Sequence, residues 1–467
     1  IFRYKRSQLI MNIIICGAGK VGFSISKQLS AQGHSVTVVD QASEDIKKIN
    51  ETQDVKGIVG RATFPSVLEN AGAANTDMII AVTKNDETNM IICQLAHSLF
   101  QVNKKIARIR SQEFLEGKWS KLYNKSNLPI DVIISPEMEV AKSLFRKLEA
   151  PGALDNVPFA DGKIKVLEIL VNKNCPVVNL SLKNLTEKFP DFKANIVGAV
   201  RESKFIFLKK NDQLLEGDKA YVVVSADQIT QILKSFGHEE KTAKKILIVG
   251  GGNIGLNLAK LLELNFEGAR VKIIEKNKER AELIATELTS SIVICGDALD
   301  EEILKEANIE ETETILALTN DDEDNIMVCV LAEKYSPAKR TIAIVNKSNY
   351  SLLQKSLNID DLVDPRMTTV SRIMEHVHKG TIERVYSVLD GEYEFIEAEV
   401  LGKSELLNKS LKDSNLPEHI RIGAVLRAEK VIIPNADFVF EKDDLVVFLA
   451  KRELLQEVES IFRISSI

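Results

Sequence analysis

Two glycine-rich turns in this chain have the residue types and spacing that bind the phosphates of a nucleotide. GAGKVG spans residues 17–22 and GGGNIG spans residues 250–255, and each follows a short apolar run and precedes a segment with helical character. In a G-x-G-x-x-G turn the first glycine permits the tight turn, the second lets the backbone approach a diphosphate, and the third lets the helix sit close to the strand. The phosphates then face a helix N-terminus, whose free N–H groups and dipole favour an anion.

An acidic residue follows each turn at the distance expected for a contact with ribose. The segment VTVVD ends in Asp40 and VKIIE ends in Glu275, close to the typical separation of about 20 residues from the turn. A carboxylate at this place accepts hydrogen bonds from a ribose diol and repels a 2′-phosphate, so NAD(H) or an adenosine nucleotide is favoured over NADP(H). The alternative for each copy is a glycine-rich turn in a doubly wound domain that binds no nucleotide.

The similarity between the two halves extends well past these turns. VKGIVGRATFPSVLENAG matches SIVICGDALDEEILKEAN, and DMIIAVTKNDETNMIIC matches TILALTNDDEDNIMVC. A helix is then predicted in each half, with a candidate N-cap and a proline at its first position (Ser135 and Pro136; Asp364 and Pro365), followed later by Gly152 or Gly380. Strings of short alternating strands end both halves. One ancestral unit was therefore copied whole.

The predicted fold class is α/β: a tandem duplication of a Rossmann-like, doubly wound parallel-sheet domain followed by a small α+β domain rich in strands. The predicted boundaries are an extension at 1–10, a Rossmann-like domain at 11–134, a connecting helix at 135–157, a β-rich domain at 158–240, a second Rossmann-like domain at 241–363, a second connecting helix at 364–384 and a second β-rich domain at 385–467. Met11 is the expected natural start, and the residues before it are expected to have no function.

Composition narrows the setting. The chain has 467 residues, of which 45% are hydrophobic and 27% charged, which suits several folded domains. A net charge of -6 and the lack of a Lys/Arg stripe with interleaved aromatic residues argue against nucleic-acid binding. Five cysteines form no CxxC pair and lie in apolar patterns, so we expect buried, reduced thiols and a cytosolic protein. No apolar stretch reaches the length of a transmembrane helix, so the chain is not expected to span a membrane.

The duplicated series resembles the RCK family, also called KTN, of regulators of potassium conductance. The resemblance rests on the two turns with their acids, on GR or GD after the third strand, on VT and DETN, on ARIRS at residues 107–111 and on GAVR and GD in the β-rich segment, and it covers residues 11–463. It implies a non-enzymatic homo-oligomer that binds NAD(H), with ATP or ADP as further candidates. It also implies a place on the cytoplasmic face of the inner membrane, where the assembly gates a membrane-embedded Trk-type potassium transporter.

The resemblance implies a role for each matching residue. Gly17, Ala18, Gly19, Lys20, Val21 and Gly22 would cradle the diphosphate, Asp40 would hold the ribose, Gly60 and Arg61 would lie near the adenine, Val82 and Thr83 would end the fourth strand, and Arg108 would lie near the phosphates. The second-copy positions are Gly250, Gly251, Gly252, Asn253, Ile254, Gly255, Glu275, Gly296, Asp297, Leu318 and Thr319. No catalytic residue and no metal ligand is implied.

The two copies depart from each other in charge. Arg61 stands where the family usually has an acid, and the basic ARIR of the first copy becomes AIVN in the second, with Asn346 in place of Arg110. Lys20, Arg61 and Arg108 give the first turn a cationic lining, whereas Asn253, Asp297 and Asn346 predict a neutral or acidic lining for the second. We therefore expect ATP to prefer the first site.

Other readings of the sequence stay open. An NAD-dependent oxidoreductase opens with the same turn, but it needs an acid/base group that the repeats do not share; a regulator of another channel or transporter is a further alternative. The acidic segments at 86–89 and 322–325 are interpreted as helix caps rather than a cation site, and His376 with His378 is not expected to bind zinc. Helical stripes serve either a core or an interface: Val140, Leu144 and Leu148, and Val370, Ile373, Met374 and Val377.

Overall fold

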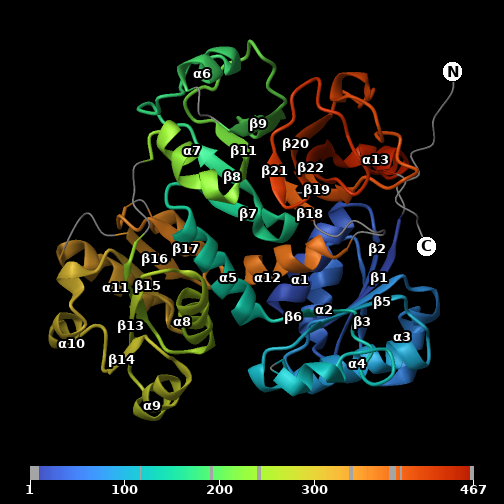
Figure 1. Cartoon of the computed structure of the whole chain (residues 1–467). Helices are drawn as coiled ribbons and strands as arrows, with labels where there is room; N and C mark the ends of the chain where they lie inside the picture. Colours follow the sequence, from blue (N-terminus) through green and yellow to red (C-terminus); the bar gives the residue numbers. More distant parts are fainter. Residues whose placement is uncertain are drawn as a thin grey trace. The chain divides into compact units, whose positions relative to one another are not determined.

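The computed structural model describes residues 10–115, 117–189, 193–238, 243–335, 340–354, 356–377, 385–389 and 392–462 (Figure 1). Nearly all of the predicted N-terminal extension, His378, Gly380 and the predicted junction at residues 240–241 lie outside these ranges. The chain divides into two compact units. One contains residues 10–143 and 243–377, and the other contains residues 144–238 and 385–462.

The first unit contains two parallel sheets, one from each half of the chain. The sheet of the first copy has the order β3-β2-β1-β4-β5-β6, the doubly wound order in which strands are added first on one side of β1 and then on the other. Its strands are β1 (Asn12–Cys16), β2 (Ser35–Asp40), β3 (Lys56–Val59), β4 (Met78–Ala81), β5 (Lys104–Arg108) and β6 (Val132–Ile134). Its helices are α1 (Lys20–Ala31), α2 (Ser43–Thr52), α3 (Pro65–Asn70), α4 (Asp86–Ser98) and α5 (Pro136–Glu149).

The sheet of the second copy repeats this order as β14-β13-β12-β15-β16-β17. Its strands are β12 (Lys245–Val249), β13 (Arg270–Glu275), β14 (Ile292–Cys295), β15 (Thr314–Ala317), β16 (Arg340–Ile344) and β17 (Asp361–Val363). Its helices are α8 (Asn253–Asn265), α9 (Lys278–Glu287), α10 (Glu301–Glu306), α11 (Asp322–Tyr335) and α12 (Pro365–Glu375). The predicted duplicated Rossmann-like fold is confirmed.

After their first residue the central strands of both sheets are apolar, as expected for strands that helices cover on both faces. In the first copy, Ile13 and Ile15 pack on one face with residues of α1 and α2. Ile14 and Cys16, which alternate with them, pack on the other face with residues of α3 and α4. This two-sided burial fixes the register of β1 and so the position of the glycine turn that follows it.

Helix α12 closes the core of the other copy. It follows the sheet of the second copy, yet Val370, Ile373 and Val377 belong to the apolar cluster of the first copy, where α12 packs on α1. These three side chains are 0%, 0% and 1% exposed. The sequence left a core and an interface role open for this stripe, and the structure combines them. The predicted cap is also confirmed, because the Asp364 carboxylate accepts the N–H groups of Arg366 and Met367.

The second unit contains two antiparallel sheets of five strands. The first has the order β10-β9-β11-β8-β7 and the second β18-β19-β22-β20-β21. The strands are β7 (Asp155–Phe159), β8 (Ile164–Leu170), β9 (Ala194–Arg201), β10 (Lys204–Ile206), β11 (Lys219–Ser225), β18 (Val385–Val388), β19 (Tyr393–Glu399), β20 (Ile420–Arg427), β21 (Lys430–Ile432) and β22 (Leu445–Lys451). The helices are α6 (Leu182–Lys188), α7 (Ile229–Ser235) and α13 (Leu455–Phe462).

The GAVR and GD segments of the first half form a buried ion pair, and GAVLR at residues 423–427 forms the matching pair with Asp444 in the second half. Arg201 binds Asp218 through two hydrogen bonds of 2.7 Å, and Arg427 binds Asp444 in the same way. Both aspartates are 0% exposed. The two domains also share one apolar cluster, in which Phe159, Tyr221 and Phe395 meet. The ion pairs therefore stabilise each β-rich domain internally, and the apolar cluster joins the two domains.

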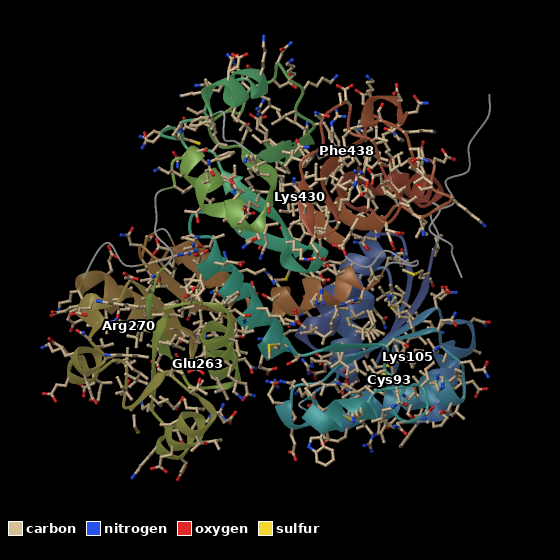
Figure 2. All side chains as sticks on the ribbon, viewed as in Figure 1. Cys93, Lys105, Glu263, Arg270, Lys430 and Phe438 are labelled. Atoms are coloured by element: carbon tan, nitrogen blue, oxygen red, sulfur yellow. The ribbon has the colours of Figure 1, made fainter. Side chains whose placement is uncertain are left out.

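Four of the five cysteines are buried, and one is not. Cys16, Cys93, Cys175 and Cys329 are buried free thiols, whereas Cys295 at the end of β14 is exposed, so the prediction of five buried thiols is wrong at this residue. Figure 2 shows Cys93 beside Lys105 in the first copy. Within the described ranges no helix is long and apolar enough to cross a membrane, and no group of three or more His, Cys, Asp or Glu residues is arranged to hold a metal ion.

Candidate functional site

The first and third glycines of each turn are fixed by close backbone packing. Gly17 has φ +120°, and a Cβ atom there would lie 2.9 Å from the carbonyl carbon of Val82. A Cβ at Gly22 would lie 1.8 Å from the Gly17 carbonyl oxygen. The second copy repeats this geometry at Gly250, with φ +105°, and at Gly255, where the distance is 2.1 Å. These four positions therefore require glycine for the turn itself.

The middle glycine of each turn has a different reason to lack a side chain. Gly19 and Gly252 have ordinary φ values of -62° and -64°, and a Cβ at either would meet no atom within 4 Å. Both are helix N-caps, and neither α1 nor α8 has a side-chain cap on its first N–H groups. The protein fold does not require glycine here, whereas a diphosphate approaching the helix N-terminus would.

The carboxylates of the two predicted ribose acids accept backbone hydrogen bonds from the glycine turns. In the first copy the Asp40 carboxylate accepts the Ala18 N–H at 2.6 Å and the Ala42 N–H at 2.9 Å. In the second copy Glu275 accepts the Gly251 N–H at 2.7 Å and the Asn277 N–H at 2.8 Å. Each oxygen therefore has one backbone partner and keeps a further lone pair for a ligand hydroxyl. The carboxylates are thus oriented before any ligand binds.

The third strands place the next predicted residues beside these acids. The Gly60 N–H donates to the Asp40 carbonyl at 2.8 Å, and the Gly296 N–H donates to the Glu275 carbonyl at 3.0 Å. Arg61 is exposed, and its guanidinium lies 5.5 Å from the ring centre of Phe64.

The matching residue of the second copy is engaged differently. Asp297 accepts a 2.6 Å hydrogen bond from Lys276. This hydrogen bond, with another from the Leu299 N–H, lowers the pKa of the Asp297 carboxyl. The position after the third-strand glycine therefore carries a cation against an aromatic ring in the first copy and an ion pair in the second.

An asparagine holds the end of the fourth strand in each copy. The Asn89 side-chain oxygen accepts the N–H and the hydroxyl of Thr83, and its amide donates to the Arg108 carbonyl. Asn325 makes the same bonds to Thr319 and to the Ile344 carbonyl. This asparagine, the last residue of the DETN and DEDN segments, therefore ties the fourth strand to the fifth.

The acidic first residue of these segments does not cap its helix. Asp86 accepts the N–H groups of Arg110 and Ser111, which follow β5, and the N-cap of α4 is Asn85, without a side-chain bond. Asp322 likewise accepts the backbone N–H groups of Asn346 and Lys347. The interpretation of Asp86 and Asp322 as caps is wrong in its mechanism, because the distant loop after the fifth strand supplies the donors. The role remains structural.

Arg108 extends from β5 toward the end of β4. Its guanidinium donates to the Thr83 carbonyl at 2.6 Å. Burial lowers the pKa of Arg108, and the neighbouring Arg110 adds to this effect. The second copy has Ile344 at this place in the strand, so the cation occurs in the first copy only.

Seven of the predicted second-copy residues line one cavity of about 440 Å³. They are Gly250, Gly252, Glu275, Gly296, Asp297, Leu318 and Thr319. The cavity lies at the carboxyl ends of β12, β13, β14 and β15, where nucleotides bind in doubly wound sheets. Gly251, Ile254 and Gly255 belong to the same turn but do not line it. Asn253 lines a broader hollow instead, together with Lys84, Asp86, Arg110 and Glu137.

Two cations in this cavity were missed by the sequence reading. Lys276 and Arg280 line it, and Arg280 donates to the Gly251 carbonyl at 2.8 Å and to the Asn253 side chain at 3.3 Å. The prediction of a neutral or acidic lining is therefore wrong at these positions. The signal was in the sequence: Glu275 is followed by KNKER, whereas Asp40 is followed by QASED.

Comparison with known proteins places the chain in a family. Residues 13–136 and 246–365 match the TrkA-N domain, and residues 166–237 and 395–463 match the TrkA-C domain. The chain is 44% identical to the Trk system potassium uptake protein TrkA of Azorhizobium caulinodans over 97% of its own length and 99% of the relative. The chain belongs to the TrkA family.

Another relative and two solved structures are also similar to this TrkA family member over nearly its whole length. The TrkA protein of Vibrio alginolyticus is 36% identical over 97% of the chain and 99% of the relative. Among solved structures, the GsuK RCK domain has a TM-score of 0.59 and 16% identity, covering 98% of this chain and 96% of that one. The GsuK channel bound to NAD has a TM-score of 0.60 and 16% identity, covering 98% and 80%. At this identity the two structures support the fold only.

Proposed function

We propose that this TrkA family member is a regulatory subunit that binds NAD(H) or adenine nucleotides at both glycine turns and thereby controls a membrane-embedded potassium transporter of the Trk type. The observation that carries the nucleotide part is an arrangement found in both copies. Each copy combines an acid oriented by backbone hydrogen bonds, a helix N-terminus without a side-chain cap and a glycine with open space around it. The potassium part is supported by relatives named for potassium uptake that match nearly the whole chain.

Binding rather than catalysis suits the cavity of the second copy. The side chains that line it are acids, amides, one threonine, two cations and apolar groups, and they include no His, Cys or Tyr. Hydride transfer usually places a His or Lys acid/base group beside the nicotinamide, whereas the lysine of this cavity, Lys276, follows β13 and is hydrogen-bonded to Asp297. A regulator needs only a nucleotide that binds two conformations with different affinity, and the coupling to its partner is limited by that difference. We further propose a homo-oligomer on the cytoplasmic face of the membrane.

Gly19→Ala and Gly252→Ala test this function with little risk to the fold. The added methyl group meets no protein atom within 4 Å in either turn, but it occupies the approach of a diphosphate. We expect both variants to keep the circular dichroism spectrum and melting temperature of the wild type. Calorimetry with NADH and ATP should show that binding is lost at the altered turn. Unchanged affinity in both variants would contradict nucleotide binding at the turns.

The transport part needs a cellular assay. Rubidium uptake should be measured in cells that lack their own TrkA-type protein, supplied with the membrane subunit from the same source and with either the wild-type chain or the Gly19→Ala/Gly252→Ala double variant. We expect the wild type to restore uptake and the double variant to lose the response to the nucleotide. Uptake that is the same with and without the chain would contradict the potassium function.

A further inference from the structure

Arg280 occupies the phosphate end of the second cavity. Its guanidinium donates to the carbonyl of Gly251, inside the glycine turn, and to the side chain of Asn253, the first residue of α8. It therefore lies at the helix N-terminus that a diphosphate would face. Arginine has five N–H donors, and these two bonds leave the others for an anion. A guanidinium in this place matches the geometry of phosphate oxygens.

The first copy supplies its cation from another element. The third residue of α9 is Arg280, and the third residue of α2 is the exposed Asp45. Conversely, α1 begins with Lys20 where α8 begins with Asn253. In the first copy the cation near the predicted phosphate position is therefore on the helix that follows the glycine turn. In the second copy it is on the helix that follows the acid.

The far side of the second cavity is acidic. Asp321 and Asp324, at the start of α11 beyond the fourth strand, line it together with Asn320. The matching residues of the first copy are Lys84, Asn85 and Thr88, as aligned by the threonine that ends each fourth strand. In a doubly wound sheet a dinucleotide crosses the switch point, so its second half lies on the side of the fourth strand. For NAD(H) that half is the nicotinamide.

We propose that the second site selects NAD⁺ over NADH and over ATP, with Arg280 binding the diphosphate and with Asp321 and Asp324 favouring the positive nicotinamide ring. This rests on the proposed nucleotide binding at the turns and adds the identity of the ligand. The oxidised ring carries a positive charge that the reduced ring lacks, and the third phosphate of ATP adds negative charge on the same side. Two carboxylates there attract the first and repel the second.

Hydrogen exchange of the full chain, measured by mass spectrometry on peptides that cover residues 246–255, resolves the second site from the first. Titrations with NAD⁺, NADH and ATP should give affinities in that order, with NAD⁺ at least about threefold tighter than NADH and about tenfold tighter than ATP. Arg280→Ala should weaken NAD⁺ about 10- to 100-fold, the range for a charged hydrogen bond, and Arg280→Lys should recover part of it. The matched control Asp45→Ala should leave the second turn unchanged.

A second variant tests the acidic side. Asp321→Asn with Asp324→Thr installs the residues of the first copy, and it should bring the affinities for NADH and ATP up to that for NAD⁺ or above it. Equal affinity of the wild-type second turn for the three nucleotides, or an Arg280→Ala variant that binds as the wild type does, would overturn the inference. Protection of the first turn alone would also overturn it. Protection of neither turn by any nucleotide would instead contradict the proposed function.

Discussion

The two Rossmann copies share their backbone geometry and differ in the charges placed on it. The acid of each copy accepts one N–H from the glycine turn and one from two residues beyond itself. Each fourth strand is held by an asparagine through the same set of bonds. Duplication has therefore kept the donors and acceptors that shape the crevice at the carboxyl ends of the strands.

The charged side chains around this geometry have been redistributed. The first copy carries Lys20, Arg61 and Arg108, while the second has Asn253, Asp297 and Ile344 at the same places. The second copy adds Lys276, directly after β13, and Arg280, on α9. Under the proposed function, the shared backbone contacts set where a nucleotide lies, and the charged side chains set which nucleotide binds. Two copies of one fold can thus report on two different ligands.

Helix α12 should give the largest effect that distinguishes the copies. Ile373→Ala removes a side chain that is 0% exposed in the core of the first copy, and we expect a loss of about 2 to 5 kcal/mol in the free energy of unfolding. Urea unfolding would measure the loss, and hydrogen exchange should show it in β1 and β2 before β12 and β13. Met367→Ala is the control, because the Met367 side chain on the same helix is 44% exposed. Faster exchange confined to the second copy would contradict the assignment.

Removing the ribose acid comes next in size. Asp40→Ala leaves the Ala18 N–H and two ligand hydroxyls without their acceptor, and we expect NADH affinity at the first turn to fall by about 1 to 3 kcal/mol. Glu275→Ala should do the same at the second turn. Calorimetry on the full chain measures both, since each variant leaves the other turn intact. If either variant bound NADH as tightly as the wild type does, the acid of that copy would have only a structural role.

Exchanging the residues after the third-strand glycine should have a smaller effect. Arg61→Asp should weaken ATP at the first turn, and Asp297→Arg should strengthen it at the second, each by roughly 1 kcal/mol because both positions are open to screening by salt. The effects should shrink as the salt concentration rises. Lys47→Asp, on an exposed face of α2, tests whether net charge alone is responsible. If all three variants bound ATP as the wild type does, these charges would not explain a difference in ATP affinity between the two copies.

An acid anchor unique to the second copy should give the smallest effect. Glu263 in α8 accepts bonds from Thr289, Ser290 and Ser291. Figure 2 labels Glu263 in this copy, whereas the first copy has Ser30 at the same place of α1. Burial opposes ionisation of Glu263, but these hydrogen bonds outweigh it and lower the pKa to about 2.

The pKa of Glu263 sets the direction of the acid response. A folded pKa below the unfolded value of about 4.3 stabilises the fold fully above pH 5, and the contribution is lost as the pH falls toward 2. Glu263→Gln should therefore lower the melting temperature by a few degrees at pH 7, and the difference from wild type should vanish near pH 2. Glu282→Gln, an exposed change on α9, is the control. A difference that grows on acidification would contradict this account.

Much of the fold was predictable because its signals are local and repeated. Each turn lies between an apolar strand and a helix, and the second copy confirmed the interpretation of the first. The partner of α12 was not predictable. The apolar stripe of Val370 and Ile373 indicates that this face is buried, but it does not indicate that the core that buries it belongs to the first copy, far away in the sequence. Arg280 was missed since the nucleotide motif ends at the acid, and comparison of the two copies beyond that point shows the charge change from Asp45.

Hydrogen exchange of the full chain with increasing ATP, measured at residues 13–22 and 246–255 in the same sample, tests the two specificities most directly. We expect ATP to protect the first turn at a lower concentration than the second, and NAD⁺ to protect the second turn at a lower concentration than ATP does. Equal protection of both turns by ATP, or earlier protection of the second, would contradict the claim that the duplicated geometry carries two different specificities.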